Sequence, residues 1–162
     1  MQNLTIITTG GTIDKVYFDA LSDYKIGEPQ ISQILHQLNV AFDFRVIDLM
    51  RKDSLDINEA DRQLIAQTVA SVESQYILIT HGTDSMVATA HALSDIKDKT
   101  IVLTGALNPA RFHGSDAVFN VGCAIGAVQS KPPGKWIAMN GIVWDCDHVR
   151  KNRSANTFET TE

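Results

Sequence analysis

Residues 76–86 of this 162-residue chain read YILITHGTDSM, and the fold is inferred outward from this stretch. Tyr76–Thr80 is an almost continuous apolar run, which is typical of a strand buried on both faces of a sheet. A small, polar turn follows at residues 81–85, and Met86–Leu93 then predicts a helix. The order of strand, polar turn and helix indicates one unit of a parallel sheet.

The same alternation continues along the rest of the chain. Further strands are predicted at Leu4–Thr9, Phe44–Met50, Thr100–Thr104 and Trp136–Val143. Helical faces are predicted from Ile31, Ile34, Leu35 and Leu38, from Ala60, Leu64, Ala66, Val69 and Val72, and over Ala117–Val128. We therefore expect an α/β fold with a doubly wound, mostly parallel sheet, in a flavodoxin-like or Rossmann-like three-layer domain over residues 1–162.

Residues 8–29, TTGGTIDKVYFDALSDYKIGEP, interrupt this alternation between the first strand and the next helix. Connections of this length inside a compact domain are mostly functional lids or binding loops. The aromatic residues and the alternating polarity of the segment favour a mobile hairpin. The sequence thus predicts a lid hairpin directly after the first strand.

Composition and charge exclude several classes of partner. Fourteen Lys and Arg against nineteen Asp and Glu give a net charge of −5, which argues against nucleic acid and acidic membranes. No apolar run approaches the ~18 residues of a membrane span, and the first thirty residues do not resemble a signal peptide. Two cysteines are too few for a disulfide framework, so a cytoplasmic location is expected.

Small and hydroxyl-bearing residues follow the predicted strands. In open α/β sheets ligands bind beyond the carboxyl ends of the strands, so these positions are the candidate site. The residues concerned are Gly10, Gly11 and Thr12, then Asp53 and Ser54, then residues 81–84, then Gly105 and Ala106, and finally Asp145, Asp147 and Lys151. Together they predict a polar pocket that the backbone can approach closely.

Two of these segments have both a functional and a structural interpretation. Gly10, Gly11 and Thr12 can direct N–H groups at developing negative charge and supply a nucleophile, or they can form a tight turn. Thr83 and Asp84 can hold a carboxylate and an ammonium group of a ligand, or they can cap the following helix.

Lys151 has two interpretations as well. It can act as a base if it is desolvated near Thr83, because burial disfavours the ammonium form. Otherwise, residues 149–153, VRKNR, form a solvated basic stretch.

The histidines and cysteines carry no recognised metal-binding motif. His36, His81, His91, His113 and His148 show no HExxH spacing and Cys123 and Cys146 no CxxC spacing, so no metal site is expected. His81 is expected to pack or to form hydrogen bonds at its strand end. Cys123 is expected in the core, within an apolar helix.

Four motifs in this order resemble the amino-terminal domain of the bacterial-type L-asparaginase family. They are TTGGTID at residues 8–14, HGTDSM at 81–86, TGALNP at 104–109 and DCDHVRKN at 145–152. Tyr24 in YKIG and Ser54 in SLDI also match. The resemblance spans nearly the whole chain.

The resemblance implies hydrolysis of the L-asparagine side-chain amide to aspartate and ammonia, with no cofactor and no metal. It assigns Thr12 as nucleophile, Tyr24 as a lid residue that helps to activate it, and Thr83, Asp84 and Lys151 as a second triad with Lys151 accepting the proton. Ser54 would bind the substrate α-carboxylate and Asp84 its α-ammonium group, and Gly11, Leu55, Gly82, Thr83 and Ala106 would complete the substrate-binding set. Leu55 stands where longer members commonly carry a polar residue, usually Gln.

The family's carboxy-terminal domain has no counterpart in these residues. We therefore expect a short-chain asparaginase with weak substrate affinity, in which a homo-oligomer completes the active site. Some glutaminase activity is also expected, because one methylene discriminates substrates by only ~10–200-fold. Two alternatives stay open: an amino-acid-binding module without turnover, and an ammonia-releasing subunit of a larger amidotransferase.

Overall fold

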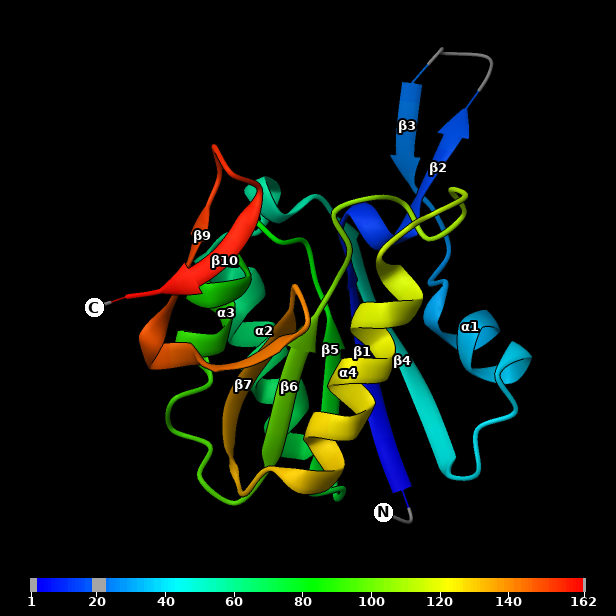
Figure 1. Ribbon diagram of the computed structural model, residues 1–162. Coiled ribbons are helices and arrows are strands. Elements are labelled where there is room, and N and C mark those ends of the chain that lie inside the picture. The colour runs from blue at the N-terminus through cyan, green and yellow to red at the C-terminus, as the bar shows by residue number, and fades with distance from the viewer. Residues whose placement is uncertain (1–2, 19–22, 162) are drawn as a thin grey trace.

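A six-stranded sheet forms the centre of the computed structural model, which describes residues 3–18 and 23–161 (Figure 1). Its strands lie in the order β4-β1-β5-β6-β7-β8. Their bounds are β1 Asn3–Gly10, β4 Asp43–Lys52, β5 Tyr76–Thr80, β6 Thr100–Thr104, β7 Gly134–Met139 and β8 Ile142–Asp145. All neighbouring pairs are parallel except β7 and β8, which confirms the doubly wound, mostly parallel sheet.

Helices cover both faces of the sheet, as the alternation predicts. They are α1 Ile31–Gln37, α2 Glu59–Ser71, α3 Met86–Ala92 and α4 Ala117–Ser130. One apolar core lies between the sheet and α2 with α3, and the second lies between the sheet and α1 with α4. Figure 1 shows α4 in front of the sheet and α2 behind it. None of the helices in the described part of the chain is long and apolar enough to cross a membrane.

The predicted apolar face of α2 is only partly correct. Ile65, not Leu64, is fully buried, and Leu64 is 43% exposed. Ala60 is exposed as well, whereas Val69 and Val72 are buried as predicted. The helix begins at a capping box, in which Asn58 and Asp61 bond to one another's backbone N–H groups. This cap fixes the helix start, and the buried face is formed by Ile65, Val69 and Val72, which follow the spacing i, i+4, i+7.

The prediction of one strand over Trp136–Val143 is wrong. Asn140 and Gly141 both have positive φ, 56° and 76°, and reverse the chain between β7 and β8. Two residues of this type form the tight turn that matches the twist of antiparallel strands. β8 therefore returns alongside β7 as an antiparallel edge strand, with Trp136 opposite Asp145.

Two hairpins stand outside the central sheet. β2 (Lys15–Phe18) and β3 (Asp23–Ile26) pair antiparallel with Tyr17 opposite Tyr24, which confirms the hairpin expected after the first strand. A second hairpin, β9 (Val149–Asn152) with β10 (Thr157–Thr160), was not predicted. Figure 1 shows both at the end of the sheet where the parallel strands finish.

Candidate active site

The candidate site begins with a close contact between the loops that follow β1, β4 and β5. An added Cβ on Gly11 would lie 2.4 Å from the Gly82 backbone nitrogen, and one on Gly82 would lie 2.5 Å from the Ser54 Cβ. Real Cβ atoms do not approach so closely, and Gly11 also has a φ of +87° that favours glycine. The sequence therefore needs glycine at both positions to bring these loops together.

A cavity of about 280 Å³ lies beside this contact. It sits between the ends of β1 and β5, where the strand order reverses and where such sheets bind ligands. Its volume suits a metabolite smaller than a drug-sized ligand. Its lining consists of Gly11, Thr12, Lys15, Asp53, Ser54, Leu55, Gly82, Thr83 and Asp84.

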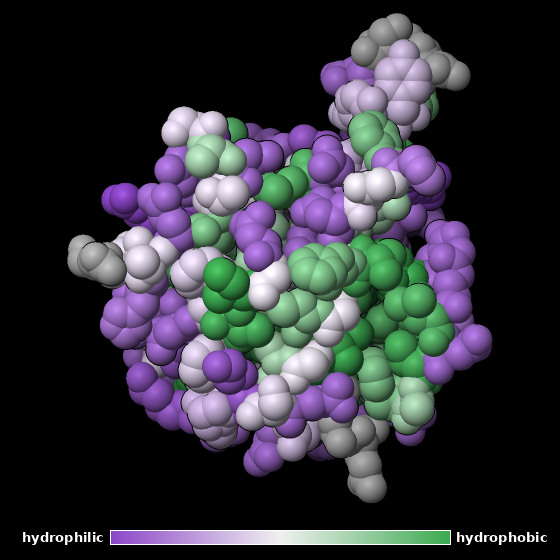
Figure 2. All heavy atoms as spheres, in the orientation of Figure 1, coloured by the Kyte–Doolittle hydropathy of each residue, from purple (hydrophilic) through white to green (hydrophobic). Residues whose placement is uncertain are grey.

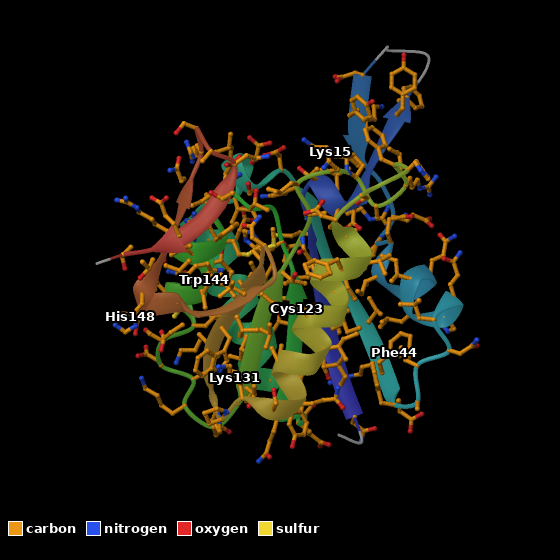
Figure 3. The ribbon with its side chains drawn as sticks, viewed as in Figure 1. Lys15, Phe44, Cys123, Lys131, Trp144 and His148 are labelled. Carbon is orange, nitrogen blue, oxygen red and sulfur yellow. The ribbon has the colours of Figure 1, made fainter. Side chains whose placement is uncertain are left out.

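Most of the residues that the sequence singles out thus line one pocket, and Lys15 joins them without having been predicted. Lys15 lies at the base of the β2–β3 hairpin (Figure 3), and its Nζ is 3.2 Å from Asp53 Oδ2. Asp53 follows β4, so this ion pair joins the hairpin to the sheet at the pocket. The strand ends alone could not reveal Lys15, because it lies in the hairpin and its long side chain reaches back to the rim.

Thr83, Asp84 and Lys151 form a bonded group at one side of the pocket. Lys151 Nζ donates to Thr83 Oγ1 at 2.6 Å and to Asp84 Oδ1 at 2.7 Å. The Lys151 side chain is only 10% exposed, so it does not belong to a solvated basic stretch. The β9–β10 hairpin brings it there, anchored by Phe158, which is buried in the core. The Arg153 guanidinium adds a second positive group, 3.6 Å from Asp84 Oδ1.

Thr12 and Ser54 present hydroxyl groups to the same space. Thr12 begins a short 3-10 helix, Thr12–Asp14, and its hydroxyl makes no hydrogen bond within the described residues. Ser54 is buried, and its Oγ accepts a bond of 3.2 Å from the Asp84 N–H. A hydroxyl that accepts one bond can still donate its own proton, so Ser54 has a donor available to a ligand.

Tyr24 and Ala106 are not brought into this pocket. Tyr24 lines a neighbouring hollow of about 450 Å³ and stacks edge-on against Tyr17 and Phe112, with ring centroids 5.4 and 5.7 Å away. That hollow shares Lys15 and Asp53 with the first cavity. Ala106 is buried in the core on the α1 and α4 side. The roles assigned to both residues stay predictions.

His81 holds the turn that carries Gly82 and Thr83. It is fully buried, and its Nδ1 lies 2.7 Å from the Gly82 carbonyl oxygen while its Nε2 lies 2.8 Å from Thr89 Oγ1. A carbonyl can only accept, so Nδ1 carries the proton and Nε2 accepts from the threonine hydroxyl. Burial lowers the pKa of His81 to about 4, so the ring stays neutral and structural.

Asp14 joins the two ends of the lid hairpin. Its backbone carbonyl accepts from the Gly27 N–H at 2.7 Å, and its Oδ1 accepts from the Gln30 N–H at 2.9 Å. The side chain is almost completely buried, and this burial raises the pKa of Asp14 from 3.8 to about 7, with a further contribution from the Asp48 carboxylate. Thr12 therefore lies two residues from a carboxyl group that changes charge near neutral pH.

Comparisons with known proteins find a family and a fold that this chain matches. The family model described as "Asparaginase, N-terminal" matches residues 3–162. L-asparaginase 2 of Escherichia coli (strain K12) is 28% identical over 173 residues, which cover 99% of this chain and 50% of that protein. The solved structure of the thermostable L-asparaginase from Thermococcus kodakarensis has a TM-score of 0.85 at 26% identity, covering 98% of this chain and 51% of that one.

One further relative carries a different name. It is a component of the glutamyl-tRNA(Gln) amidotransferase of Methanosphaera stadtmanae, and it is 30% identical over 167 residues, which cover 94% of this chain and 37% of that protein. The chain spans about half the length of the curated relatives it matches.

Gly82→Ala is expected to destabilise the fold, because the new Cβ would overlap the Ser54 Cβ and Oγ at 2.5 and 2.8 Å. Overpacking of this kind costs roughly 1–3 kcal/mol. The matched control is Gly126→Ala in α4, where no atom lies within 4 Å of the new Cβ. That change should stabilise the helix by about 0.5–1 kcal/mol. Urea unfolding measures both, and a Gly82→Ala variant as stable as the parent would contradict the contact.

Asp14→Asn is expected to change how stability depends on pH. With its pKa raised from 3.8 to about 7, folded Asp14 keeps a proton that the unfolded chain has released, so wild-type stability falls as pH rises through that window. The variant has no such proton. Its free energy of unfolding relative to wild type should therefore rise between pH ~4 and ~8, by up to about 4 kcal/mol.

Denaturant unfolding at a series of pH values measures this difference. His81 titrates equally in both proteins, so its contribution cancels. Asp98→Asn, which changes an exposed aspartate, serves as the control and should show no such trend. The same pH dependence in wild type and Asp14→Asn would show that Asp14 is not the responsible group.

Proposed function

Because residues 3–162 match its model, the chain belongs to the asparaginase family, and we propose that it is an amidohydrolase that releases ammonia from the side-chain amide of L-asparagine. The observation that carries this proposal is the 2.6 Å bond from Lys151 Nζ to Thr83 Oγ1 at a pocket that also contains the Thr12 hydroxyl. A hydroxyl becomes a good nucleophile, or relays a proton, only when a base is held beside it. A module that only binds amino acids needs no such pair.

The first step of the proposed reaction uses Thr12, whose hydroxyl is not engaged by a neighbour among the described residues. Its oxygen forms a bond to the amide carbon, and the carbonyl electron pair moves to oxygen. When this intermediate collapses, the carbon–nitrogen bond breaks and the nitrogen leaves as ammonia, taking up the proton that Thr12 gave. The Gly11 N–H is held by the Lys52 carbonyl, so the proposed donors to the oxyanion are backbone N–H groups next to Gly11 and at Thr83, together with the Thr83 side chain.

The second step uses the Thr83–Lys151 pair. Water adds to the acyl group on Thr12, the ester bond breaks, and aspartate leaves while Thr12 regains a proton. Lys151, once it has passed a proton to the Asp84 carboxylate 2.7 Å away, accepts the proton of the attacking water through Thr83 and returns it to Thr12. Tyr24 lies outside the pocket, so its proposed part in activating Thr12 requires the hairpin to move towards the sheet.

The charges around the pocket suit a zwitterionic amino acid. Ser54 and Lys15 offer a donor and a positive charge for the α-carboxylate, and Asp84 offers a carboxylate for the α-ammonium group. Leu55 lines the pocket with a side chain that forms no hydrogen bonds. Each missing charge-assisted bond is worth ~1.5–3 kcal/mol, which supports the proposal of a high KM. We propose that the same pocket also hydrolyses L-glutamine as a side activity.

A component of an amidotransferase is the second candidate function. It is favoured by the relative from Methanosphaera stadtmanae, which is 30% identical over 94% of this chain, against 28% over 99% for the E. coli L-asparaginase 2. In that case the same pocket releases ammonia for a partner protein. Turnover by the isolated chain separates the two candidates. A cytoplasmic location and the absence of a cofactor complete the proposal, and both cysteines being free fits the location.

Thr12→Ala and Thr83→Ala should each lower kcat for ammonia release by about a thousandfold or more, because members of one catalytic group act as a unit. The assay measures ammonia from L-asparagine between micromolar and tens of millimolar, with L-glutamine in parallel. Thr68→Ala changes a threonine on the outer side of α2 and should keep full activity. If either site variant stays folded and keeps a near wild-type kcat, the role assigned to that threonine is wrong.

The proposed homo-oligomer is supported by exposed apolar side chains on α4 and β8. Phe119 is 64% exposed, and Val118 and Ile142 are each 48% exposed. Figure 2 shows apolar side chains gathered in the middle of the face that α4 covers. Contiguous exposed apolar surface on a small protein marks an interaction site. A second copy bound through this surface is the proposed source of the groups that complete the pocket.

Sedimentation is expected to give at least twice the chain mass of 17.8 kDa. Phe119→Glu should return the protein to a monomer, because a charge would be buried in the contact. Leu64→Glu makes the same kind of change at a residue on α2, 43% exposed, and should leave the oligomer intact. A wild-type monomer at assay concentration would contradict the proposal.

A further inference from the structure

Three side chains with metal-binding atoms meet near the carboxy-terminal end of α3, and none of them lines the pocket. His91 lies near the end of α3, while Cys146 and Asp147 belong to the 3-10 helix η4 (Cys146–His148) between β8 and β9. One ring nitrogen, the Sγ and one carboxylate oxygen all lie within 4.8 Å of one another. We propose that His91, Cys146 and Asp147 bind a divalent transition-metal ion of the zinc type.

The spacing of the donor atoms matches a tetrahedral site. His91 Nε2 lies 3.4 Å from Asp147 Oδ1, and Cys146 Sγ lies 3.7 Å from the same oxygen. In a tetrahedral zinc site with bonds of roughly 2.0–2.3 Å, neighbouring ligand atoms are roughly 3.3–3.5 Å apart. Asp147 is therefore already placed to share an ion with both other groups, whereas the His91 ring nitrogen and the Cys146 sulfur, which lie within 4.8 Å of one another, move together on binding; water supplies the fourth ligand.

The donor set selects the class of metal. Calcium and magnesium take oxygen ligands, whereas one sulfur, one imidazole nitrogen and one carboxylate oxygen suit zinc and its neighbours. His91 Nε2 now lies 2.9 Å from the Cys146 carbonyl oxygen and donates to it; on binding, the ring proton would be carried by Nδ1, the Cys146 thiol proton would pass to solvent, and the ion would bind Nε2 and the thiolate. The Cys146 side chain is buried while His91 and Asp147 are exposed, so an ion can enter from solvent.

Binding at this point would join two elements that both lead to the pocket. α3 begins directly after the turn that holds Thr83 and Asp84, and η4 leads directly into β9, which carries Lys151. An ion between His91 and Cys146 therefore ties β9 to α3. The binding site itself does not depend on the proposed amidase activity. Only the further effect, a more firmly positioned Lys151 side chain, rests on the proposed amidase activity.

Sequence motifs could not reveal this cluster. His91 and Cys146 are separated by 55 positions, and neither belongs to a paired-ligand motif. The expectation of no metal site rested on the missing HExxH and CxxC spacings, which detect only ligands that are close in sequence. Here the fold brings the ligands together. η4, which carries two of the three ligands, lies at the edge of the molecule. Figure 3 shows this by its last residue, His148, which lies away from Cys123 in α4.

Titration of the reduced, metal-free full chain with Co²⁺ tests the proposal. Binding should produce a thiolate-to-cobalt charge-transfer band, which added Zn²⁺ abolishes by displacement. Cys146→Ser should lose the band, and His91→Gln should weaken Zn²⁺ binding by about tenfold or more, since even changes beyond the direct ligands cost about 10–100-fold. Zn²⁺ should also raise the unfolding temperature of wild type but not of Cys146→Ser.

Matched controls come from the same chain. Cys123→Ser removes the other cysteine and His36→Gln removes a histidine on α1, and both should bind the metal like wild type. Thr12→Ala should bind it too, so loss of amidase activity and loss of metal binding are distinguishable. A folded wild-type chain that shows no band would overturn the proposal. So would Cys146→Ser and His91→Gln variants that bind the metal as tightly as wild type.

Discussion

The close approach of three backbone segments at Gly11, Gly82 and Ser54 is the constraint on which the rest of the site depends. The loops after β1, β4 and β5 reach this contact only because two of the three residues have no Cβ. The contact then sets the positions of Thr12, Ser54 and Thr83, each of which is one of these residues or the next in sequence. Hydrogen bonds reinforce it, from Gly11 N–H to the Lys52 carbonyl and from Asp84 N–H to Ser54 Oγ.

Around this rigid contact, the charged groups come from the two peripheral hairpins. Lys15, at the base of β2, pairs with Asp53, and Lys151 on β9 pairs with Asp84. Each positive charge thus meets a carboxylate that stands on a loop of the central sheet. The arrangement keeps both signs of charge at a small cavity, which is what recognition of an amino acid requires. The hairpins thus supply the positive charges at the pocket, and the loops of the sheet supply the carboxylates.

The sequence predicts the sheet and most of the pocket for the same reason. Continuous apolar runs identify buried parallel strands, and residues such as Thr12 and Thr83 follow directly at their carboxyl ends. The pattern of apolar residues is less informative where either of two neighbouring residues could belong to the buried face of a helix. In α2 the prediction took Leu64 for the buried face, whereas Ile65, four residues before Val69, is the residue that is fully buried. The Asn140–Gly141 signal for a turn was present, but it lay inside an apolar run.

Sequence patterns could not predict contacts that are made by long side chains or between segments far apart in the chain. Lys15 reaches Asp53 across the hairpin base, and His91 meets Cys146 from another part of the chain. Tyr24 and Ala106 show the opposite case, because motif matching groups them with Thr12 although they line a different hollow and the core. Side-chain direction depends on the local backbone, which a motif does not specify.

The central claim is that this pocket turns over an amino-acid amide and does not merely bind it. Isothermal titration calorimetry of L-asparagine into the folded chain tests this claim most directly. Turnover produces a sustained heat signal after each injection, which grows with protein concentration and lasts until the substrate is consumed. That is the result the structure leads us to expect. A saturating binding isotherm without sustained heat would identify a binding module and contradict the assignment of Thr12 and Thr83 to catalysis.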